Sequence, residues 1–267
     1  MAELGKKATR IIAVANQKGG VGKTTTAINL ATAMAASKKT VLLIDLDPQG
    51  NASTGLGIPR DARDVNSYHV LIGEAGLAET THATEIPGLK VVPSGVDLSG
   101  AEIELVDMER RETRLAEALR ESVGLYDYVL IDCPPSLNLL TLNALVAANS
   151  VMVPLQCEFF ALEGISHLVK TIEAVRKRFN PMLELQGIVL TMFDKRNNLT
   201  EQVAADVREF FGEKVYKTVI PRNVRISEAP SYGKPVLIYD HKCAGSEAYI
   251  HLAAEVLKRE VSLIKGV

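Results

Sequence analysis

The 267-residue sequence lacks the features of a secreted or membrane-spanning protein. Its first ten residues, MAELGKKATR, contain no apolar run and so do not resemble a secretory signal. No apolar run elsewhere approaches the ~20 residues that a helix needs to cross a bilayer. Its three cysteines lie far apart and form no C-x-x-C pair, which argues against a disulfide framework or a clustered metal site. These absences predict a soluble protein of the reducing cytoplasm.

Internal repeats, low-complexity tracts and linker-like breaks are also missing, which predicts one domain over residues 1–267. Hydrophobic residues make up 47% of the sequence and charged residues 23%, as in an ordinary globular protein with a substantial core. Residues 1–9 carry Lys6 and Lys7 but no periodic pattern, and we expect a flexible leader there.

Short apolar runs alternate with longer segments of helical period along the sequence. The predicted strands are residues 10–15, 40–45, 89–93, 126–132, 151–155, 186–192 and 215–220. The predicted helices are residues 24–36, 113–122, 141–148, 164–179, 200–211 and about 246–264. The strands are continuous apolar runs, as expected for a parallel sheet covered on both faces. We therefore predict a doubly wound α/β fold with a mostly parallel sheet and ligands bound beyond its carboxyl edge.

The stretch NQKGGVGKTTT, residues 16–26, joins the first predicted strand to the first predicted helix and resembles a phosphate-binding loop. Its glycines let successive backbone N–H groups turn towards phosphate oxygens, and the helix N-terminus adds partial positive charge. We expect Lys23 to contact the β- and γ-phosphates, Thr24 to hold Mg²⁺ and Thr25 to bond the α-phosphate. The predicted fold is P-loop NTPase-like, with ATP and Mg²⁺ as cofactors. The predicted nucleotide contacts in the loop are Lys18, Gly19, Gly20, Val21, Gly22, Lys23, Thr24 and Thr25.

Acidic residues end two further predicted strands. Asp132 ends YDYVLID, the position of a carboxylate that orders magnesium-bound water. Asp45 and Asp47 end LLIDLD and, being two residues apart, face the same side. We expect Asp45 beside magnesium-bound water and Asp47 further out, where it would orient the attacking water.

One position in the loop departs from the usual pattern. Gln17 occupies the place of the customary first glycine, and a second lysine, Lys18, follows it. A lysine at this place is either a solvated surface group or a second functional cation.

Five segments together resemble the ParA/Soj family of chromosome-partition ATPases, from about residue 10 to the end: KGGVGKTT, DLDPQGN, DCPPSLNLLTLNAL, QCEFFALEG and IPRNVRISEAPSYGKP. This family belongs to the deviant Walker-A group, whose signature lysine occupies the Lys18 position. The resemblance implies an ATP-sandwich homodimer in which Lys18 reaches the partner's nucleotide and Gly19 sits where the two loops meet. It also implies that Asp47 is the hydrolysis carboxylate. The residues that it places beside the adenine are Pro221, Arg222 and Asn223.

The expected activity is hydrolysis of ATP to ADP and phosphate, with Lys18, Lys23 and Asp47 as catalytic residues. A well-placed cation delivered in trans is worth ~10³–10⁵ in rate. No Glu or His offers itself as a strong general base, so hydrolysis should be slow unaided. By resemblance, the stimulating partner is a ParB-type centromere-binding protein.

A basic stretch between Lys214 and Lys242 contains six lysines and arginines against two acidic residues. Charge counts alone favour a solvated surface, but the resemblance places Arg196 and Arg225 where DNA-contacting residues occur. The neighbours predicted with them are Lys214, Lys217, Lys234 and Lys242. Phosphate contacts of this kind need no base reading, so the expected partner is non-specific DNA and the expected location is the nucleoid.

Two other functions share this nucleotide core. A membrane-cycling ATPase of the Min type would need a basic amphipathic C-terminal tail, whereas YIHLAAEVLKREVSLIKGV reads more simply as a helix packed on the core. We therefore expect no membrane partner. An iron–sulfur relative would use Cys133 and Cys157, but their spacing matches no cluster motif.

Some plasmid relatives carry an additional N-terminal helix-turn-helix domain. Because the first predicted strand starts near Arg10, we expect no such domain and favour the chromosomal type.

Overall fold

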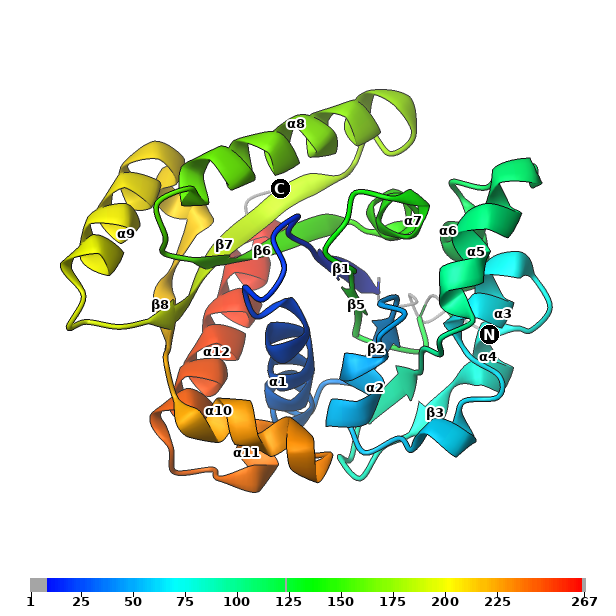
Figure 1. Ribbon diagram of the computed structural model, residues 1–267, viewed down its shortest axis with the longest axis horizontal. Coiled ribbons are helices and arrows are strands. Elements are labelled where there is room, and N and C mark those ends of the chain that lie inside the picture. The colour runs from blue at the N-terminus through cyan, green and yellow to red at the C-terminus, as the bar shows by residue number, and fades with distance from the viewer. Residues whose placement is uncertain (1–8, 123, 266–267) are drawn as a thin grey trace.

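A twisted eight-stranded sheet runs through the middle of the computed structural model, which describes residues 9–122 and 124–265, the last five by backbone alone (Figure 1). The strand order is β3-β4-β2-β5-β1-β6-β7-β8. The strands are β1 (Arg10–Val14), β2 (Val41–Asp45), β3 (His82–Ala83), β4 (Leu89–Val92), β5 (Tyr128–Asp132), β6 (Ser150–Gln156), β7 (Glu184–Phe193) and β8 (Val215–Pro221). Neighbours pair in parallel except β3, which is antiparallel to β4. The predicted doubly wound, mostly parallel sheet is therefore confirmed.

Helices cover both faces of the sheet. One face carries α3 (Ser67–Ile72), α4 (Leu77–Thr80), α5 (Leu98–Glu104), α6 (Arg114–Leu119), α7 (Leu139–Ala147), α8 (Ala161–Arg178) and α9 (Asn198–Phe211). The other carries α1 (Lys23–Ala36), α2 (Asn51–Gly55), α10 (Val224–Glu228), α11 (Val236–Tyr239) and α12 (Ala244–Lys265). Short 3-10 turns are η1 (Arg60–Ala62), η2 (Leu105–Asp107), η3 (Arg120–Ser122), η4 (Gly212–Lys214) and η5 (Ala229–Tyr232).

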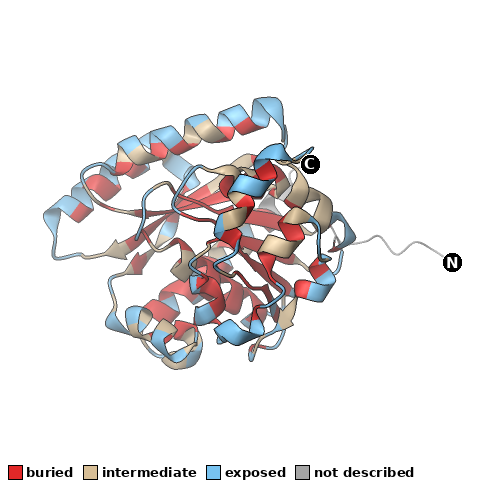
Figure 2. Ribbon diagram, turned by 45° about the vertical axis from the view of Figure 1, so that its right-hand side comes forward, coloured by how far each residue is buried: buried red, intermediate tan, exposed pale blue. Residues whose placement is uncertain are grey.

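The continuous apolar strands supply both layers of the core. Along β1, Ile11 and Ala13 join the core of one face, while Ile12 and Val14 join the core of the other. This division follows from the alternation of side chains along a strand, and it explains why these strands are mostly apolar on both sides. Figure 2 shows the result as a sheet whose strands are almost entirely buried.

The strand register brings the carboxyl ends of three strands together. Asp45 at the end of β2 lies beside Asp132 at the end of β5, and Asp132 lies beside Val14 at the end of β1. The chain leaves β1 through α1 on one face towards β2, and leaves β5 through α7 on the other face towards β6. Ligand sites of doubly wound folds form where the connections diverge in this way.

The long predicted elements are present, with ends shifted by a few residues. Short elements between β2 and β5 were missed, because α2 to α5 and β3 have too few residues to show a period. The predicted leader falls on residues 1–8, which lie outside the described residues, and on Thr9. The Thr9 hydroxyl donates to the Tyr126 carbonyl at 2.8 Å, so this residue is already anchored to the domain.

The final helix packs as the sequence predicts. Leu252 and Val256 of α12 are fully buried, and the helix lies against α1 and β8. Glu255 accepts hydrogen bonds from the backbone N–H groups of Lys217 and Thr218 at 2.9 and 3.0 Å, which fixes α12 to β8. Within the described residues, no helix is both long and apolar enough to cross a membrane.

We predict that Leu252→Ala lowers the free energy of unfolding by about 2–5 kcal/mol, because it leaves a cavity between α12 and α1. The matched control is Ile250→Ala on the same helix, whose side chain is 48% exposed. That change should stay within about 0.5 kcal/mol in urea unfolding. Equal losses in the two variants would show that α12 is not anchored through this face.

Candidate nucleotide-binding site

The glycine loop has the backbone shape that phosphate binding requires. Gly20 and Gly22 have φ of 72° and 84°, in the left-handed region that side chains disfavour. Gly22 immediately precedes α1, so the loop delivers the N-terminus of this helix to the edge of the sheet. Lys18, Gly19 and Gly20 are exposed, whereas Val21 is buried. Thr24 and Thr25 follow in the first turn of α1, and the predicted strand–loop–helix arrangement is present.

Lys23 is nearly buried, at 6% exposure, and points back into the loop. Its Nζ donates to the Lys18 carbonyl at 3.0 Å, and no carboxylate pairs with it among the ion pairs of the described residues. Burial lowers the pKa of Lys23, and the neighbouring Asp132 partly opposes this shift. A cation held in this way is ready to exchange a neutral carbonyl for a phosphate oxygen.

Two residues that sequence analysis missed hold the loop in place. Asn16 donates through Nδ2 to the Pro154 carbonyl at 2.8 Å and accepts from the Lys18 N–H at 3.0 Å. The Thr191 hydroxyl of β7 donates to the Val21 carbonyl at 2.8 Å. Asn16 stands in the motif and could have been found there. Thr191 is remote in the sequence and carries no local signal.

Asp45 is fully buried at the end of β2. Its Oδ2 accepts from the Ser53 N–H at 2.8 Å and from the Ser53 hydroxyl at 2.7 Å, and its Oδ1 accepts from the Asp47 N–H at 3.2 Å. Burial raises the pKa of Asp45 to about 6, although the Ser53 hydrogen bonds act in the opposite direction. Ser53 is thus a further site residue that the sequence did not reveal.

Asp132 is also fully buried, and neither of its carboxylate oxygens has a hydrogen-bond partner among the described residues. Burial, followed by the charge of Asp45, raises the pKa of Asp132 well above its usual value. Buried carboxylate oxygens without donors are rare, and water bound to a divalent cation would supply the missing donors. The side chains therefore fit the predicted role of Asp45 and Asp132 in holding Mg²⁺ through water.

No cluster of three or more His, Cys, Asp or Glu side chains suited to a metal occurs in the part of the chain that the structure describes. Mg²⁺ does not require one, because it is usually held by one or two carboxylates together with waters and substrate phosphates. The arrangement thus suits a metal that arrives with a nucleotide.

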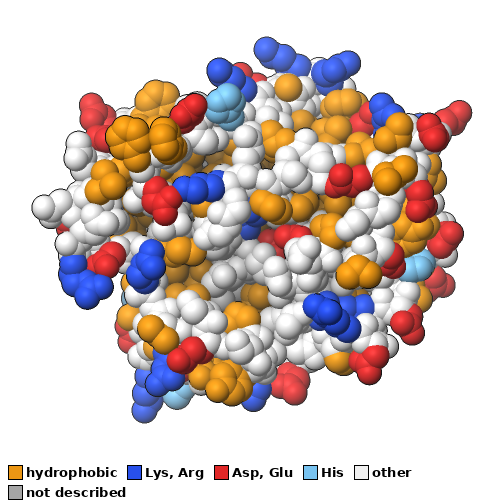
Figure 3. All heavy atoms as spheres, in the orientation of Figure 1, with side chains coloured by type: hydrophobic (Ala, Val, Ile, Leu, Met, Phe, Trp, Pro, Cys, Tyr) orange, Lys and Arg blue, Asp and Glu red, His pale blue; other side chains and the backbone are white. Residues whose placement is uncertain are grey.

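The remaining predicted nucleotide residues lie at the same edge of the sheet. Asp47 is nearly buried, and its Oδ1 accepts from the Gln49 N–H at 3.0 Å. Pro221 ends β8, and Arg222 and Asn223 follow it, with the Asn223 side chain capping α10. Figure 3 shows a hollow near the middle of this face in which acidic and basic side chains are recessed. The predicted nucleotide residues therefore come from four parts of the chain that reach the same edge of the sheet.

Lys18 has a different environment from Lys23. Its side chain is half exposed, and its ammonium pairs with Glu158, which follows β6. The two lysines of the loop therefore point to different places, one into the loop and one away from it.

The predicted DNA-contacting residues fall into two separate regions. Arg225, Lys234 and Lys242 are exposed on or near α10 and α11, and Arg196 is exposed on the loop after β7. The Arg222 N–H donates to the Phe193 carbonyl at 3.1 Å, so the loops that follow β7 and β8 are neighbours. These four residues lie towards the edge of the sheet that carries the glycine loop.

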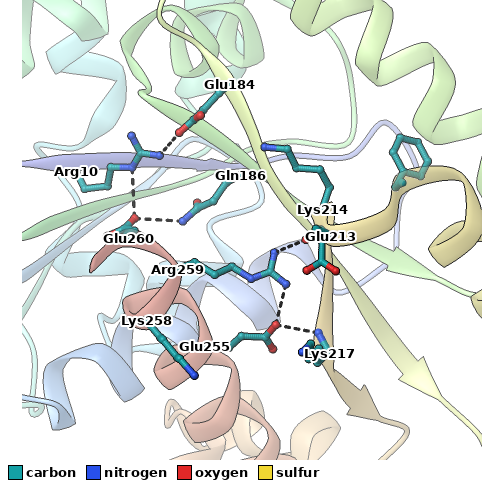
Figure 4. A pocket seen from close by; sticks show the side chains of 11 residues that line it. Arg10, Glu184, Gln186, Glu213, Lys214, Lys217, Glu255, Lys258, Arg259 and Glu260 are labelled. Atoms are coloured by element: carbon teal, nitrogen blue, oxygen red, sulfur yellow. Dashed lines mark hydrogen bonds and ion pairs between the residues drawn. The ribbon is translucent and has the colours of Figure 1, made fainter. Parts of the chain in front are cut away.

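Lys214 and Lys217 do not join them. Lys214 ends η4 directly before β8, and Lys217 lies near the start of β8, a strand that carries the chain roughly 20 Å to the nucleotide edge. They line a cavity of about 610 Å³ at the opposite edge, together with Arg10 and with Glu255, Lys258, Arg259 and Glu260 of α12 (Figure 4). The structure therefore does not combine the six predicted residues into one DNA surface.

The two cysteines of the iron–sulfur alternative are buried. Burial raises the pKa of the Cys157 thiol to about 11, and raises the pKa of the Cys133 thiol further. Because metal ligation needs the thiolate, these environments disfavour a cluster at these two residues.

Comparison with known proteins adds a family match and close relatives. A family model described as an AAA domain matches residues 9–185. The chain is 64% identical over 253 residues to the chromosome partitioning protein ParA of Caulobacter vibrioides, covering 94% of this chain and 95% of that protein. It is 52% identical over 247 residues to the sporulation initiation inhibitor protein Soj of Bacillus subtilis, covering 92% and 98%.

Solved structures show the same fold. Cobyrinic acid a,c-diamide synthase from Mycobacterium smegmatis, solved with a bound ATP analogue and magnesium, matches with a TM-score of 0.84 and 38% identity, covering 95% of this chain and 96% of that one. The cell division ATPase MinD of Pyrococcus furiosus matches with a TM-score of 0.77 and 29% identity, covering 93% and 98%.

We predict that the affinity for Mg²⁺–ATP rises between about pH 5 and pH 7. Burial raises the pKa of Asp45 from its usual 3.8 to about 6, so the metal-free folded protein favours the protonated carboxyl. The contribution of this carboxyl to the free energy of unfolding is complete below about pH 3.8 and is lost as pH rises through about 6. A divalent cation favours the ionised carboxylate and reverses this preference. Calorimetric titrations should show a steeper rise for the parent protein than for Asp45→Asn. The nucleotide's own titration is common to both, so parallel pH curves would contradict the assignment.

Proposed function

The chain belongs to the ParA/Soj family of chromosome-partitioning ATPases, and on that premise we propose that it works as an ATP-driven switch on DNA. In the proposed cycle, ATP and Mg²⁺ assemble a sandwich homodimer that binds DNA without sequence preference. A ParB-type partner then stimulates hydrolysis, and the dimer dissociates and leaves the DNA. The proposed location is the cytoplasm, in association with the nucleoid.

The observation that carries this proposal is the direction of Lys18. Lys23 already serves the chain's own loop, while the exposed Lys18 side chain is directed towards Glu158. An exposed ion pair of this kind is worth about 0–1 kcal/mol, so Lys18 is easily transferred to a stronger anion. The phosphates of a facing copy would be such an anion. Without them, two facing lysines would repel each other, which would make dimerisation depend on ATP.

Exposed apolar side chains beside the loop support contact with a second copy. Phe159 and Phe160 follow β6 and are 77% and 66% exposed, with ring centroids 5.1 Å apart in an edge-to-face pair. Leu137, which follows β5, is also exposed. Apolar and aromatic groups grouped at one edge are typical of surfaces that a partner covers.

The proposed hydrolytic site divides its work among few groups. The phosphates would be bound by Lys23, by the loop N–H groups and by Lys18 of a facing copy. Thr24 would hold the metal directly, and Asp45 and Asp132 would hold it through bound water. Mg²⁺, when bound, would neutralise charge on the phosphates. Asp47 would orient the attacking water. The proposed adenine contacts are Pro221, Arg222 and Asn223.

The proposed DNA surface comprises Arg196, Arg225, Lys234 and Lys242. Arg225 pairs with Glu228 at 2.9 Å and with Asp240 at 3.5 Å, but it remains half exposed. Such contacts are exchangeable, because DNA phosphates are strong competitors for a surface guanidinium. Lys214 and Lys217 are left out of this surface because they lie at the opposite edge of the sheet.

The Min-type alternative receives no support from α12. Leu252, Ala253 and Val256 are buried where the helix packs on α1 and β8, so this face of the helix is not open to lipid.

We predict that Lys18→Ala retains ATP binding, because Lys23 and the loop backbone remain, but loses ATP-dependent dimerisation. Sedimentation velocity with ATP should show dimer for the parent protein and monomer for the variant. Lys23→Ala is the comparison, since it should lose nucleotide binding itself. A Lys18→Ala protein that still dimerises with ATP would refute the sandwich arrangement.

We predict that DNA binding requires ATP and that Arg225→Ala reduces the slope of log K against log salt by about one. The matched test of placement is Lys217→Ala, which removes a cation at the opposite edge and should leave the slope unchanged. Fluorescence anisotropy with no nucleotide, ADP and ATP would measure both effects. Equal affinity of the nucleotide-free protein would count against an ATP-gated switch.

A further inference from the structure

The backbone of Asp47 is held by two neighbours. The Gly50 N–H donates to the Asp47 carbonyl at 2.8 Å, and the Ser94 hydroxyl donates to the same carbonyl at 2.7 Å. Gly50 directly precedes α2 as its N-cap, whereas Ser94 follows β4. The carbonyl of Asp47 is therefore tied both to its own loop and to a neighbouring strand end.

Arg63 connects the two residues that hold this carbonyl. Its Nη1 donates to the Gly50 carbonyl at 3.2 Å and to the Ser94 carbonyl at 3.4 Å. Its Nε donates to the Ile58 carbonyl at 3.2 Å. The guanidinium thus spans the loop after β2, the end of β4 and the turn after α2.

The environment of Arg63 is unusual for a cation. Its residue exposure is 7%, and it takes part in none of the ion pairs among the described residues. Burial lowers the pKa of Arg63. A buried guanidinium that bonds carbonyl and hydroxyl oxygens carries a desolvation cost. Hydrogen bonds to several backbone acceptors in a fixed geometry offset this desolvation cost. A flexible lysine cannot make the same set of hydrogen bonds.

Gly50 is shaped to admit this contact. Its φ is 63°, and a Cβ atom placed there would lie 2.5 Å from Arg63 Nη1 and 3.1 Å from the Ser94 carbonyl oxygen. Any side chain at residue 50 would therefore push the guanidinium away from the loop. The glycine of the DLDPQGN segment is therefore needed for the approach of Arg63 as well as for the turn.

Hydrogen bonds rather than packing hold the loop on its outer side. A cleft of about 360 Å³ opens there, lined by Pro48, Gln49, Arg63 and Ser94 among others. Because this side lacks tightly packed side chains, the Asp47 loop has room to move if the guanidinium contacts are lost.

We propose that Arg63 is a positioning residue for ATP hydrolysis, which acts by fixing Asp47 through Gly50 and Ser94. The inference rests on the proposed role of Asp47 in orienting the attacking water. A displacement of about 1 Å in such a group is enough to cost on the order of 100-fold in rate. Arg63 itself contacts neither the glycine loop nor the predicted metal carboxylates by a hydrogen bond among those described.

The primary test is Arg63→Lys in the full chain, with Arg60→Lys as the matched control. Arg60 lies three residues away, is exposed and lines the same cleft. We expect Arg63→Lys to lower kcat about 10- to 100-fold at saturating ATP, while the Kd for ATP stays within about twofold. Arg60→Lys should behave as the parent protein in both measurements. A merely structural defect would weaken ATP binding together with the rate.

Ser94→Ala is a second variant, and it leaves the buried Arg63 guanidinium unchanged. It removes the hydroxyl that holds the Asp47 carbonyl, and it should lower kcat with unchanged ATP binding. Normal turnover in both Arg63→Lys and Ser94→Ala would overturn the inference. Loss of ATP affinity in step with kcat would overturn it as well.

Asp47→Ala separates this inference from the proposed function. That variant should bind ATP but fail to turn over. If it hydrolyses ATP normally, the water-orienting role of Asp47 fails, and the role of Arg63 fails with it. If it is inactive while Arg63→Lys and Ser94→Ala turn over normally, only the positioning role is refuted.

Discussion

Two carboxylates buried side by side at adjacent strand ends set the conditions for the rest of the site. Asp45 and Asp132 are aligned by the β2–β5 register, and burial raises the pKa of each, with the charge of Asp45 adding to the shift at Asp132. Such a pair disfavours its own ionisation until a cation is close. Lys23 supplies part of that charge, because the negative charge of Asp132 is the strongest of the neighbouring charges that favour the charged form of Lys23. These opposite charges meet at one edge of the sheet. The glycine loop and the first turn of α1 place Lys23 there, and the Ser53 hydrogen bonds hold Asp45.

Sequence patterns revealed the parts of the site that are local. The glycine loop and the carboxylates at strand ends stand within short segments, and parallel strands necessarily bring their carboxyl ends together. Ser53, Ser94 and Arg63 escaped notice because serine and arginine have no distinctive pattern, and their roles depend on contacts across the fold. The same limitation applies to Thr191, which meets the loop from β7.

The grouping of Lys214 and Lys217 with Arg225 as neighbours in the sequence does not hold in the fold, for a different reason. Lys214 and Arg225 are only eleven residues apart in number, yet β8 lies between them and carries the chain from one edge of the sheet to the other. A charge count over consecutive residues does not show that a strand carries the chain from one edge of the sheet to the other. The resemblance to the ParA/Soj family identified Arg196 and Arg225 individually, and the structure places both towards the nucleotide edge.

The packing of α12 on α1 also has a consequence for synthesis of the chain. The helix that follows the glycine loop is made early, but the surface that covers it comes from the end of the sequence, where the Tyr249 and Thr26 hydroxyls approach to 3.4 Å. During translation the apolar side of α1 must therefore wait, exposed or held by a chaperone, until α12 leaves the ribosome. A nascent chain that stalls before this point would carry every phosphate-binding residue and still lack the support that keeps them in position.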